Sequence, residues 1–239
     1  MLSQKIMTRL KKYKYLYRHR KKLKNVDISQ DDICNNNILL GNNVEIADSR
    51  LRGELEIGDY AKISNCRISA SADSKVIVGR GVLIQGNGTT LSSRFTNIKV
   101  GDFSTLGLGC HLFESSHKMD TYTAQFLDKR LLRTTLSDNA TTAGGIEIGP
   151  DCIIGLNSVI AGGTRLGAGC VVLPNSFVNQ AFEPYGIIGG VPATRLGERF
   201  SKRKKIYLES LDWYNWPIEK IKEKLDLLST PVSTKNRLN

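Results

Sequence analysis

Apolar residues recur at intervals of six in the segment between positions 148 and 178. The residues at this spacing are Ile148, Ile154, Ile160, Leu166, Val172 and Val178. A surface helix places an apolar residue every three or four positions and a strand face every two, so neither explains a period of six. A chain that turns a corner every six residues does explain it, because one apolar side chain per turn then points into a shared core. The pattern predicts a solenoid of hexapeptide repeats.

The positions between these apolar residues support the same interpretation. Glycine follows the apolar residue at Gly149, Gly155 and Gly167. A small residue or a cysteine stands four positions after the apolar one, at Cys152, Ser158, Thr164, Cys170 and Ser176. Glycine permits the unusual backbone angles that tight corners need, and an inward position at a corner has room only for a small side chain. Both features are typical of the corners of a solenoid.

Upstream of this segment the repeat is less regular. Pairs or triplets at the same spacing are Leu40 and Ile46, Ile57 and Ile63, Val78 and Ile84, and Val100, Leu106 and Leu112. The gaps between these groups are not multiples of six, which predicts coils with bulges or short insertions. The solenoid is therefore expected to run from about position 38 to position 178.

The end points of the repeat divide the chain into parts. Residues 1–36 are predicted to form a basic helical arm, and residues 37–193 the β-helix domain, with a loop excursion over 113–145 where the repeat stops. Residues 194–228 are predicted to form a basic segment and an amphipathic helix that starts near Pro217. Residues 229–239 are predicted to be a flexible tail.

The formal charge of +11 is concentrated at the N-terminus, where ten basic residues precede the first acid, Asp27. Ile6, Leu10, Tyr13 and Tyr17 lie at helical spacing in this arm, so it is expected to form a basic amphipathic helix. Two interpretations stay open: contact with an anionic membrane surface or a polyanionic glycan, and a cap on the end of the solenoid. Nucleic acid is not an expected partner, because no recognisable binding module accompanies the charge.

Composition narrows the cellular setting. No segment has the apolar length of a membrane span, and the N-terminal residues lack the apolar core of a signal peptide. The five cysteines are odd in number and show no metal spacing. They are interpreted as buried free thiols in a reducing compartment. We therefore expect a cytoplasmic protein, with the inner face of the membrane as a peripheral location.

Histidine is scarce, and His117 is the candidate for catalysis. It lies at the start of the excursion, where a loop leaves a rigid wall, which suits a general base. Asp120 is a candidate to orient it. His111 and His117 are six positions apart, on successive faces of one coil, and no third histidine is suitably placed, so no metal is expected. Gly162 and Gly163 could suggest phosphate binding, but they are in phase with the repeat and a corner turn is favoured.

Three motifs resemble one known family. Ser-His-Lys-Met-Asp at 116–120 resembles the Asn-His-Arg-Met-Asp around that family's catalytic histidine. Ile-Gly-Gly-Val-Pro-Ala at 188–193 resembles its Gly-Gly-Asn-Pro-Ala coil closure, and Leu-Asp-Trp-Tyr-Asn-Trp-Pro-Ile-Glu at 211–219 its Lys-Trp-Trp-Asn-Trp-Pro-Ile helix entry. The family is the hexapeptide-repeat acyltransferases. Within it, the similarity is to the xenobiotic acetyltransferases, which comprise streptogramin and type B chloramphenicol acetyltransferases and related saccharide O-acetyltransferases.

This resemblance implies a left-handed parallel β-helix that forms a homotrimer. It implies acetyl-CoA as the donor, bound in the groove between neighbouring subunits, and His117 as the base that deprotonates an acceptor hydroxyl. The residues that it implies for CoA binding are Gly155, Gly162, Gly163, Asn175, Ser176, Arg195, Arg199 and Lys202.

Three functions remain as hypotheses. The extra coils before Val100 and the basic arm favour an O-acetyltransferase that acts on a saccharide, either a surface polysaccharide or its precursor. The first alternative is an antibiotic O-acetyltransferase of the chloramphenicol or streptogramin type. The second is a non-catalytic or metal-binding solenoid that scaffolds partners. The sequence does not identify the acceptor or the hydroxyl that is modified.

Overall fold

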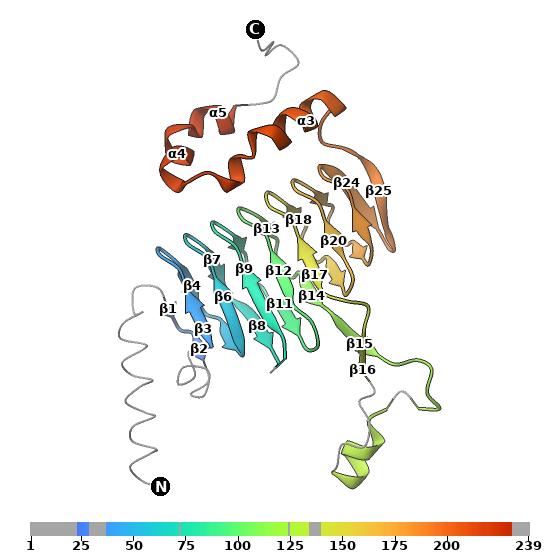
Figure 1. The fold of residues 1–239 in the computed structure, drawn as a ribbon. Helices are drawn as coiled ribbons and strands as arrows, with labels where there is room; N and C mark the ends of the chain where they lie inside the picture. The colour runs from blue at the N-terminus through green and yellow to red at the C-terminus, as the bar shows by residue number, and fades with distance from the viewer. Residues whose placement is uncertain (1–22, 29–36, 72, 124, 134–139, 231–239) are drawn as a thin grey trace, which may run out of the picture. The chain divides into compact units, whose positions relative to one another are not determined.

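The computed structural model describes residues 23–28, 37–71, 73–123, 125–133 and 140–230. The chain divides into two compact units, Met1–Arg199 and Phe200–Asn239. The first unit is a parallel β-solenoid in which successive coils contribute one strand to each of three sheets (Figure 1). This architecture is the one that the period of six predicts.

Strands from successive coils lie next to one another in each sheet. Sheet A contains, in order, β1 (Leu23–Lys24), β4 (Glu45–Ala47), β7 (Lys62–Ser64), β10 (Leu83–Ile84), β13 (Thr105–Leu106), β18 (Ile153–Ile154), β21 (Val171–Val172), β24 (Gly186–Gly190) and β25 (Ala193–Glu198). Sheet B contains β2 (Asp27–Ile28), β5 (Arg50–Arg52), β8 (Cys66–Ala70), β11 (Thr89–Ser93), β14 (His111–Phe113), β19 (Val159–Ala161) and β22 (Phe177–Val178). Sheet C contains β3 (Ile38–Leu40), β6 (Glu54–Ile57), β9 (Lys75–Val78), β12 (Ile98–Val100), β17 (Ile146–Ile148), β20 (Arg165–Leu166) and β23 (Ala181–Phe182).

The apolar ladder forms the core of the solenoid. All six of its residues between positions 148 and 178 are buried, with exposed fractions of 3% or less. Parallel pairing places Ile154 beside Val172 and Ile160 beside Val178, one coil apart. Residues eighteen apart therefore stack on the same face, and the ladder lies in a shared core as predicted.

The irregular upstream coils have a third apolar position that the spacing does not reveal. Leu51, Ile68 and Leu91 are fully buried on sheet B. They complete the coils begun by residues that the repeat identified on sheets A and C. The interruptions are therefore coils with sides of unequal length, as the sequence predicts.

The solenoid begins earlier than the sequence predicts. β1 pairs with β4 through Leu23 and Ile46, and β2 pairs with β5 through Ile28 and Leu51. Both short strands fall within residues 1–36, which the sequence assigns to the arm. Isolated two-residue strands carry too little pattern to be recognised, and only stacking on the next coil defines them. The predicted helix in the arm lies outside the described residues.

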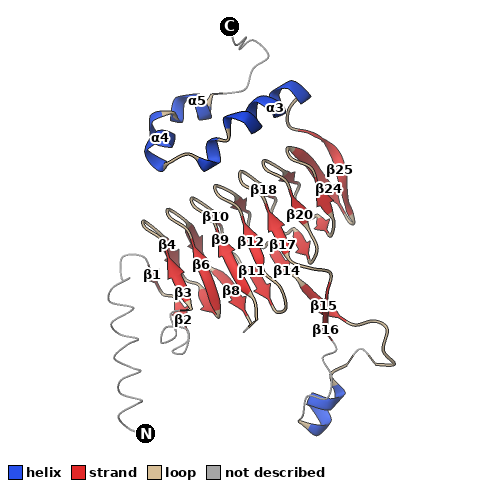
Figure 2. Cartoon of the chain, in the orientation of Figure 1, coloured by secondary structure: helices blue, strands red, loops and turns tan. Residues whose placement is uncertain are grey.

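The second unit is helical (Figure 2). Its elements are α3 (Lys202–Leu211), the 3-10 turn η2 (Trp213–Asn215), α4 (Ile218–Glu223) and α5 (Leu225–Ser229). The predicted C-terminal helix is present as α4 and α5, which are separated at Lys224. The charged stretch at 202–205 opens α3, which the sequence analysis leaves as a basic segment. Residues 231–239 of the predicted tail lie outside the described residues. Among the helices in the described ranges, none is long and apolar enough to cross a membrane.

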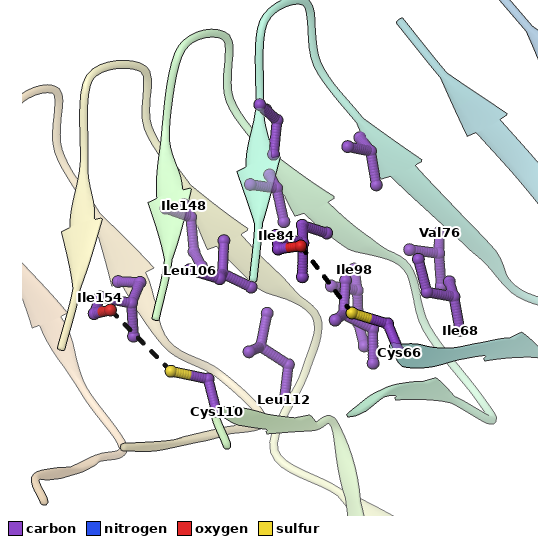
Figure 3. Close-up of a cluster of buried hydrophobic side chains, with 14 of the residues drawn as sticks. Cys66, Ile68, Val76, Ile84, Ile98, Leu106, Cys110, Leu112, Ile148 and Ile154 are labelled. Atoms are coloured by element: carbon purple, nitrogen blue, oxygen red, sulfur yellow. Dashed lines mark hydrogen bonds between the residues drawn. The ribbon is translucent and has the colours of Figure 1, made fainter. Parts of the chain in front are cut away.

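Free thiols line part of the core, as predicted. Cys66, Cys110, Cys152 and Cys170 are buried and form no disulfide, and Cys34 lies outside the described residues. Figure 3 shows the thiols of Cys66 and Cys110 among apolar side chains, close to the carbonyl oxygens of Ile84 and Ile154. Burial raises the pKa of the Cys66 thiol to about 12.

Candidate active site

His117 lies on a hairpin that leaves the solenoid. After β14, the chain enters β15 (Ser115–His117), which pairs in antiparallel fashion with β16 (Ala140–Thr142) and places His117 opposite Ala140. Figure 1 shows this pair projecting from the wall beyond β14 and β17. A short π-helix, η1 (Asp128–Leu132), lies between the two strands in sequence. The hairpin gives the histidine a defined position in a region that is otherwise a long excursion.

A buried carboxylate holds the base of the hairpin. The side chain of Glu114 is 1% exposed, because the alternation of the strand turns it inward after Leu112. Its Oε1 accepts hydrogen bonds from the backbone N–H groups of Arg94 and Phe95, the latter at 2.7 Å. Its Oε2 accepts one from Thr96 Oγ1 at 3.1 Å. A charged acceptor with several donors forms strong bonds, so Glu114 ties the hairpin to the loop between β11 and β12.

Gly162 and Gly163 form the corner beneath the returning strand of the hairpin. A Cβ on Gly162 would lie 2.3 Å from the carbonyl oxygen of Glu114, which excludes any side chain there. Gly163 has a φ of +81° and donates its N–H to the carbonyl oxygen of Gly144 at 3.0 Å. Thr142 Oγ1 donates to the carbonyl oxygen of Glu114 at 2.6 Å. The two glycines thus have the corner role that their phase in the repeat favours.

Aromatic and cationic groups surround the imidazole. The exposed ring of His117 meets Phe126 edge-on, with centroids 5.1 Å apart and an interplanar angle of 61°. The Arg94 guanidinium carbon lies 5.8 Å from the centroid of the Phe126 ring, and Lys129 Nζ lies 5.2 Å from that centroid. Arg94 also lies over Phe95, at 4.9 Å. The loop that Glu114 holds therefore reaches His117 through Arg94 and Phe126.

Asp120 is the residue that the sequence offers to orient His117. Its side chain is exposed, and in the ranges that the structure covers no hydrogen bond or ion pair joins it to His117. The residue in contact with the imidazole is Phe126. The sequence analysis missed Phe126 and Glu114. The sequence does contain a signal for Glu114. It stands two positions after Leu112, so its side chain should point inward, where a carboxylate needs hydrogen-bond donors.

His111 lies on β14, on the outer face of sheet B. Its ring stacks on Phe113, with centroids 5.9 Å apart, and its Nδ1 is buried without a hydrogen-bond partner. No group of three or more His, Cys, Asp or Glu side chains in the described ranges is arranged to hold a metal ion.

The corner that contains Gly155 brings together two of the residues implied for CoA binding. A Cβ on Gly155 would lie 2.5 Å from the backbone nitrogen of Pro174, one residue before Asn175. Asn175 is exposed, has a φ of +57° and donates its N–H to the carbonyl oxygen of Leu156 at 2.9 Å. The side chain of Ser176 instead points inward, is 2% exposed and donates to the carbonyl oxygen of Leu173 at 2.6 Å.

The arginines implied for CoA binding are engaged with carboxylates of the chain itself. Arg195 forms an ion pair with Glu198. Arg199 Nη1 contacts Asp151 Oδ2 at 3.1 Å and donates to the carbonyl oxygen of Gly169 at 2.7 Å. Burial raises the pKa of Asp151, and Arg199 opposes that shift. Lys202 is exposed at the start of α3, in the second unit.

Comparisons with known proteins identify relatives of the chain. No family model matches the chain. A chloramphenicol acetyltransferase from Morganella morganii is 31% identical over 135 residues, which are 54% of this chain and 64% of that protein. The chain therefore spans less than two thirds of the length of the chloramphenicol acetyltransferase. A probable macrolide acetyltransferase from Lysinibacillus sphaericus is 30% identical over 152 residues, which are 59% of this chain and 84% of the relative.

A solved structure shares the fold. AntD, an N-acyltransferase from Bacillus cereus crystallised with dTDP and 3-hydroxybutyryl-CoA, superposes with a TM-score of 0.59. The alignment covers 79% of this chain and 97% of AntD at 22% identity, a level of similarity that shows the fold alone. The macrolide acetyltransferase, by contrast, is matched over most of its length. The chain therefore belongs to the hexapeptide-repeat acyltransferase family, together with the macrolide and chloramphenicol acetyltransferases.

Proposed function

We propose that this chain transfers an acetyl group from acetyl-CoA to a hydroxyl of a saccharide, with His117 as the general base. The observation that carries the proposal is the position of His117. Its imidazole is exposed on a hairpin anchored to the solenoid wall, within the motif that surrounds the catalytic histidine of the family. The relatives named as acetyltransferases support the activity.

The proposed reaction needs one proton carrier. The neutral imidazole of His117 accepts the proton of the acceptor hydroxyl while the oxygen attacks the thioester carbonyl. A carbon–oxygen bond forms, the carbon–sulfur bond breaks, and the sulfur of CoA leaves with the proton that the imidazolium returns. Phe126 restricts the rotation of the imidazole, which keeps its free nitrogen directed at the acceptor.

Acetyl-CoA is proposed as the co-substrate. AntD, which shares the fold, was crystallised with an acyl-CoA, so the solenoid can present a surface for this ligand. The corner of Gly155 and Asn175 is the proposed contact, because the side-chain amide of Asn175 is exposed there. Arg195 and Arg199 are weaker candidates for the phosphates, since each would have to leave its carboxylate. Acetyl-CoA as donor agrees with the cytoplasmic location expected from the sequence.

A homotrimer is proposed as the assembly. Leu108, Leu156 and Leu173 lie in successive coils at the corner between sheets A and B and are 38–45% exposed. Exposed leucines gathered at one corner favour contact with another copy of the chain. Sedimentation equilibrium tests this assignment, and a monomer at micromolar concentration would contradict it.

The alternative acceptor is an antibiotic, which the names of the two relatives support. Steady-state kinetics with chloramphenicol, a macrolide and neutral and acidic oligosaccharides separates the two. The saccharide proposal expects the highest kcat/KM on an oligosaccharide. A higher kcat/KM on either antibiotic would identify the antibiotic as the acceptor, and the proposed role of His117 as general base would stay the same.

The decisive variant is His117→Ala. We expect kcat to fall by about 100-fold or more, which is the usual contribution of a general base. Because the side chain is exposed, the melting temperature and the affinity for acetyl-CoA should stay unchanged. Glu147→Gln, which alters an exposed carboxylate on sheet C, is the matched control. If His117→Ala keeps more than a few per cent of the activity, His117 is not the base, and if the wild type binds no acetyl-CoA, a scaffold function is favoured.

A further inference from the structure

A polar hollow lies at the opposite end of sheet B from the closing coils. It has a volume of about 510 Å³, within the range of about 300–1,000 Å³ of small-molecule sites. It follows the corner between sheets A and B across the first coils. Its lining residues are Asn25, Asp27, Asp48, Ser49, Arg50, Asn65, Cys66, Arg67, Gly88 and Thr90.

The acidic groups of this hollow are already engaged. Asp27 Oδ2 contacts Arg50 at 3.0 Å and Arg52 at 2.7 Å, and the hydrogen bond from Arg52 lowers the pKa of Asp27. Asp48 Oδ1 accepts a hydrogen bond from Asn25 at 2.9 Å. Two guanidinium groups therefore balance the charge of Asp27, whereas Asp48, bonded to a neutral amide, keeps its negative charge at the edge of the hollow.

Arg67 differs in its bonding from the residues beside it on the neighbouring strands of sheet B. The register places it between Arg50 and Thr90 on the outer face of sheet B, and its side chain is exposed. Within the residues that the structure covers, its guanidinium has no ion pair and no hydrogen bond. The adjacent corner residue Asn65 likewise leaves its side-chain amide unbonded there. A guanidinium next to a side-chain amide offers donors for a carboxylate or phosphate on a sugar, while the hydroxyl of Thr90 already donates to the carbonyl oxygen of Gly88 at 3.0 Å.

The same row leads towards the hairpin. Arg67 is in register with Thr90 on β11, and Thr90 with His111 on β14, so two strand steps of about 4.8 Å each separate Arg67 from His111. The parallel row on this face carries Ser69, Ser92 and Phe113. β14 then continues into the strand that bears His117. A ligand extended along this face would meet hydroxyls first and an aromatic surface last.

We propose that the hollow and the outer face of sheet B bind an anionic acceptor, with its acidic group on Arg67 and a hydroxyl further along the chain at His117. This inference rests on the proposed acetyl transfer and narrows its substrate to an anionic saccharide, either an acidic oligosaccharide or a nucleotide-linked sugar. The spacing requires an extended acceptor, because Arg67 lies two strand steps from β14, which leads into the hairpin. A carboxylate in the glycan and a diphosphate in a nucleotide-linked sugar share the chemistry that Arg67 recognises.

The test compares three acceptors on four proteins. The acceptors are galacturonic acid tetramer, neutral maltotetraose and UDP-glucose, and the proteins are wild type, Arg67→Ala, Arg67→Lys and Lys99→Ala. Lys99 is an exposed cation on the outer face of sheet C, so its removal costs the same charge at a different place. Arg67→Ala should raise KM for the anionic acceptors by about tenfold with little change in kcat, whereas Arg67→Lys should restore part of the loss. Lys99→Ala should resemble the wild type.

Two results would overturn the inference. One is a wild type that prefers maltotetraose or shows no preference, and the other is an Arg67→Ala variant equally impaired on the neutral and anionic acceptors. An effect confined to UDP-glucose would identify the diphosphate as the source of the charge, and one confined to the tetramer the carboxylate. Isothermal titration with the same three acceptors, without acetyl-CoA, keeps the test independent of catalysis. If no acceptor is acetylated but the tetramer binds through Arg67, the proposed function fails and the binding site stands.

Discussion

Replacing Glu114 by glutamine tests whether a buried carboxylate supports the hairpin of His117. The side chain is 1% exposed and accepts hydrogen bonds from two backbone N–H groups and from the hydroxyl of Thr96. Glutamine preserves the shape and one carbonyl oxygen, so both backbone bonds can persist without the charge. A hydrogen bond to a charged group contributes about 1.5–3 kcal/mol and a neutral one about 0.5–1.5 kcal/mol.

The expected loss follows from these values. Two bonds weakened by about 1 kcal/mol each lower the free energy of unfolding by about 2 kcal/mol in Glu114→Gln. Removal of the buried charge offsets part of this loss, because a carboxylate is costly to desolvate. Three donors already face this carboxylate, so we expect the loss of the bonds to exceed the gain. Glu114→Ala should be worse, since it leaves two buried N–H groups without an acceptor at about 1–3 kcal/mol each.

Urea unfolding followed by circular dichroism measures the difference as a shift of the midpoint at constant m value. Glu147→Gln is the control, because Glu147 is exposed and its ion pair with Arg165 is long, at 3.9 Å. That variant should change stability by less than about 0.5 kcal/mol. If Glu114→Gln is as stable as the wild type, the desolvation cost dominates, and the anchoring role assigned to Glu114 is refuted.

Two further predictions concern the core. Leu91→Ala should cost about 2–5 kcal/mol because Leu91 is fully buried, whereas Leu39→Ala, at a position 54% exposed on sheet C, should be nearly neutral in urea unfolding; equal effects would contradict the assignment of Leu91 to the core. Burial raises the pKa of Cys66 from its ordinary value of 9.0 to about 12, so the folded protein keeps the thiol proton where the unfolded chain loses it. The free energy of unfolding should therefore be insensitive to this group below pH 9.0 and fall as the pH rises from there towards 12. Iodoacetamide at pH 8 should therefore label Cys66 in urea but not in the native protein, as judged by mass spectrometry.

How much of the fold the sequence predicts depends on the length of each side of the coil. Between Ile148 and Val178 every side has six residues, so a fixed period finds the apolar ladder there, whereas Ile188 in the last coil is out of phase and is also buried. Upstream, Leu51 follows Ile46 by five residues and Leu91 follows Ile84 by seven, and a fixed period passes over both. The structure places them in the core because stacking on the neighbouring coil, through pairs such as Leu51 with Ile68, sets the register. This information is long-range and has no local signal.

The site shows the same division between local and long-range information. The break in the repeat locates His117 correctly on the excursion, since a loop that leaves a solenoid interrupts its period. Closeness in sequence makes Asp120 a candidate partner of His117, although Asp120 lies beyond the end of β15. Phe126 contacts the imidazole instead, which only the path of the excursion determines.

Charges make the limit of sequence reasoning clearest. The resemblance makes Arg195 and Arg199 candidates for CoA binding, and the structure pairs them with Glu198 and Asp151. Arg67 has no special sequence context, but the register puts it next to Arg50 while the nearby carboxylate of Asp27 is occupied by Arg50 and Arg52. Whether a cation is available to a ligand therefore depends on which carboxylates the neighbouring coils have already brought to it. In a solenoid that pairing follows from strand register, and so the register that builds the core also decides where an anionic substrate can bind.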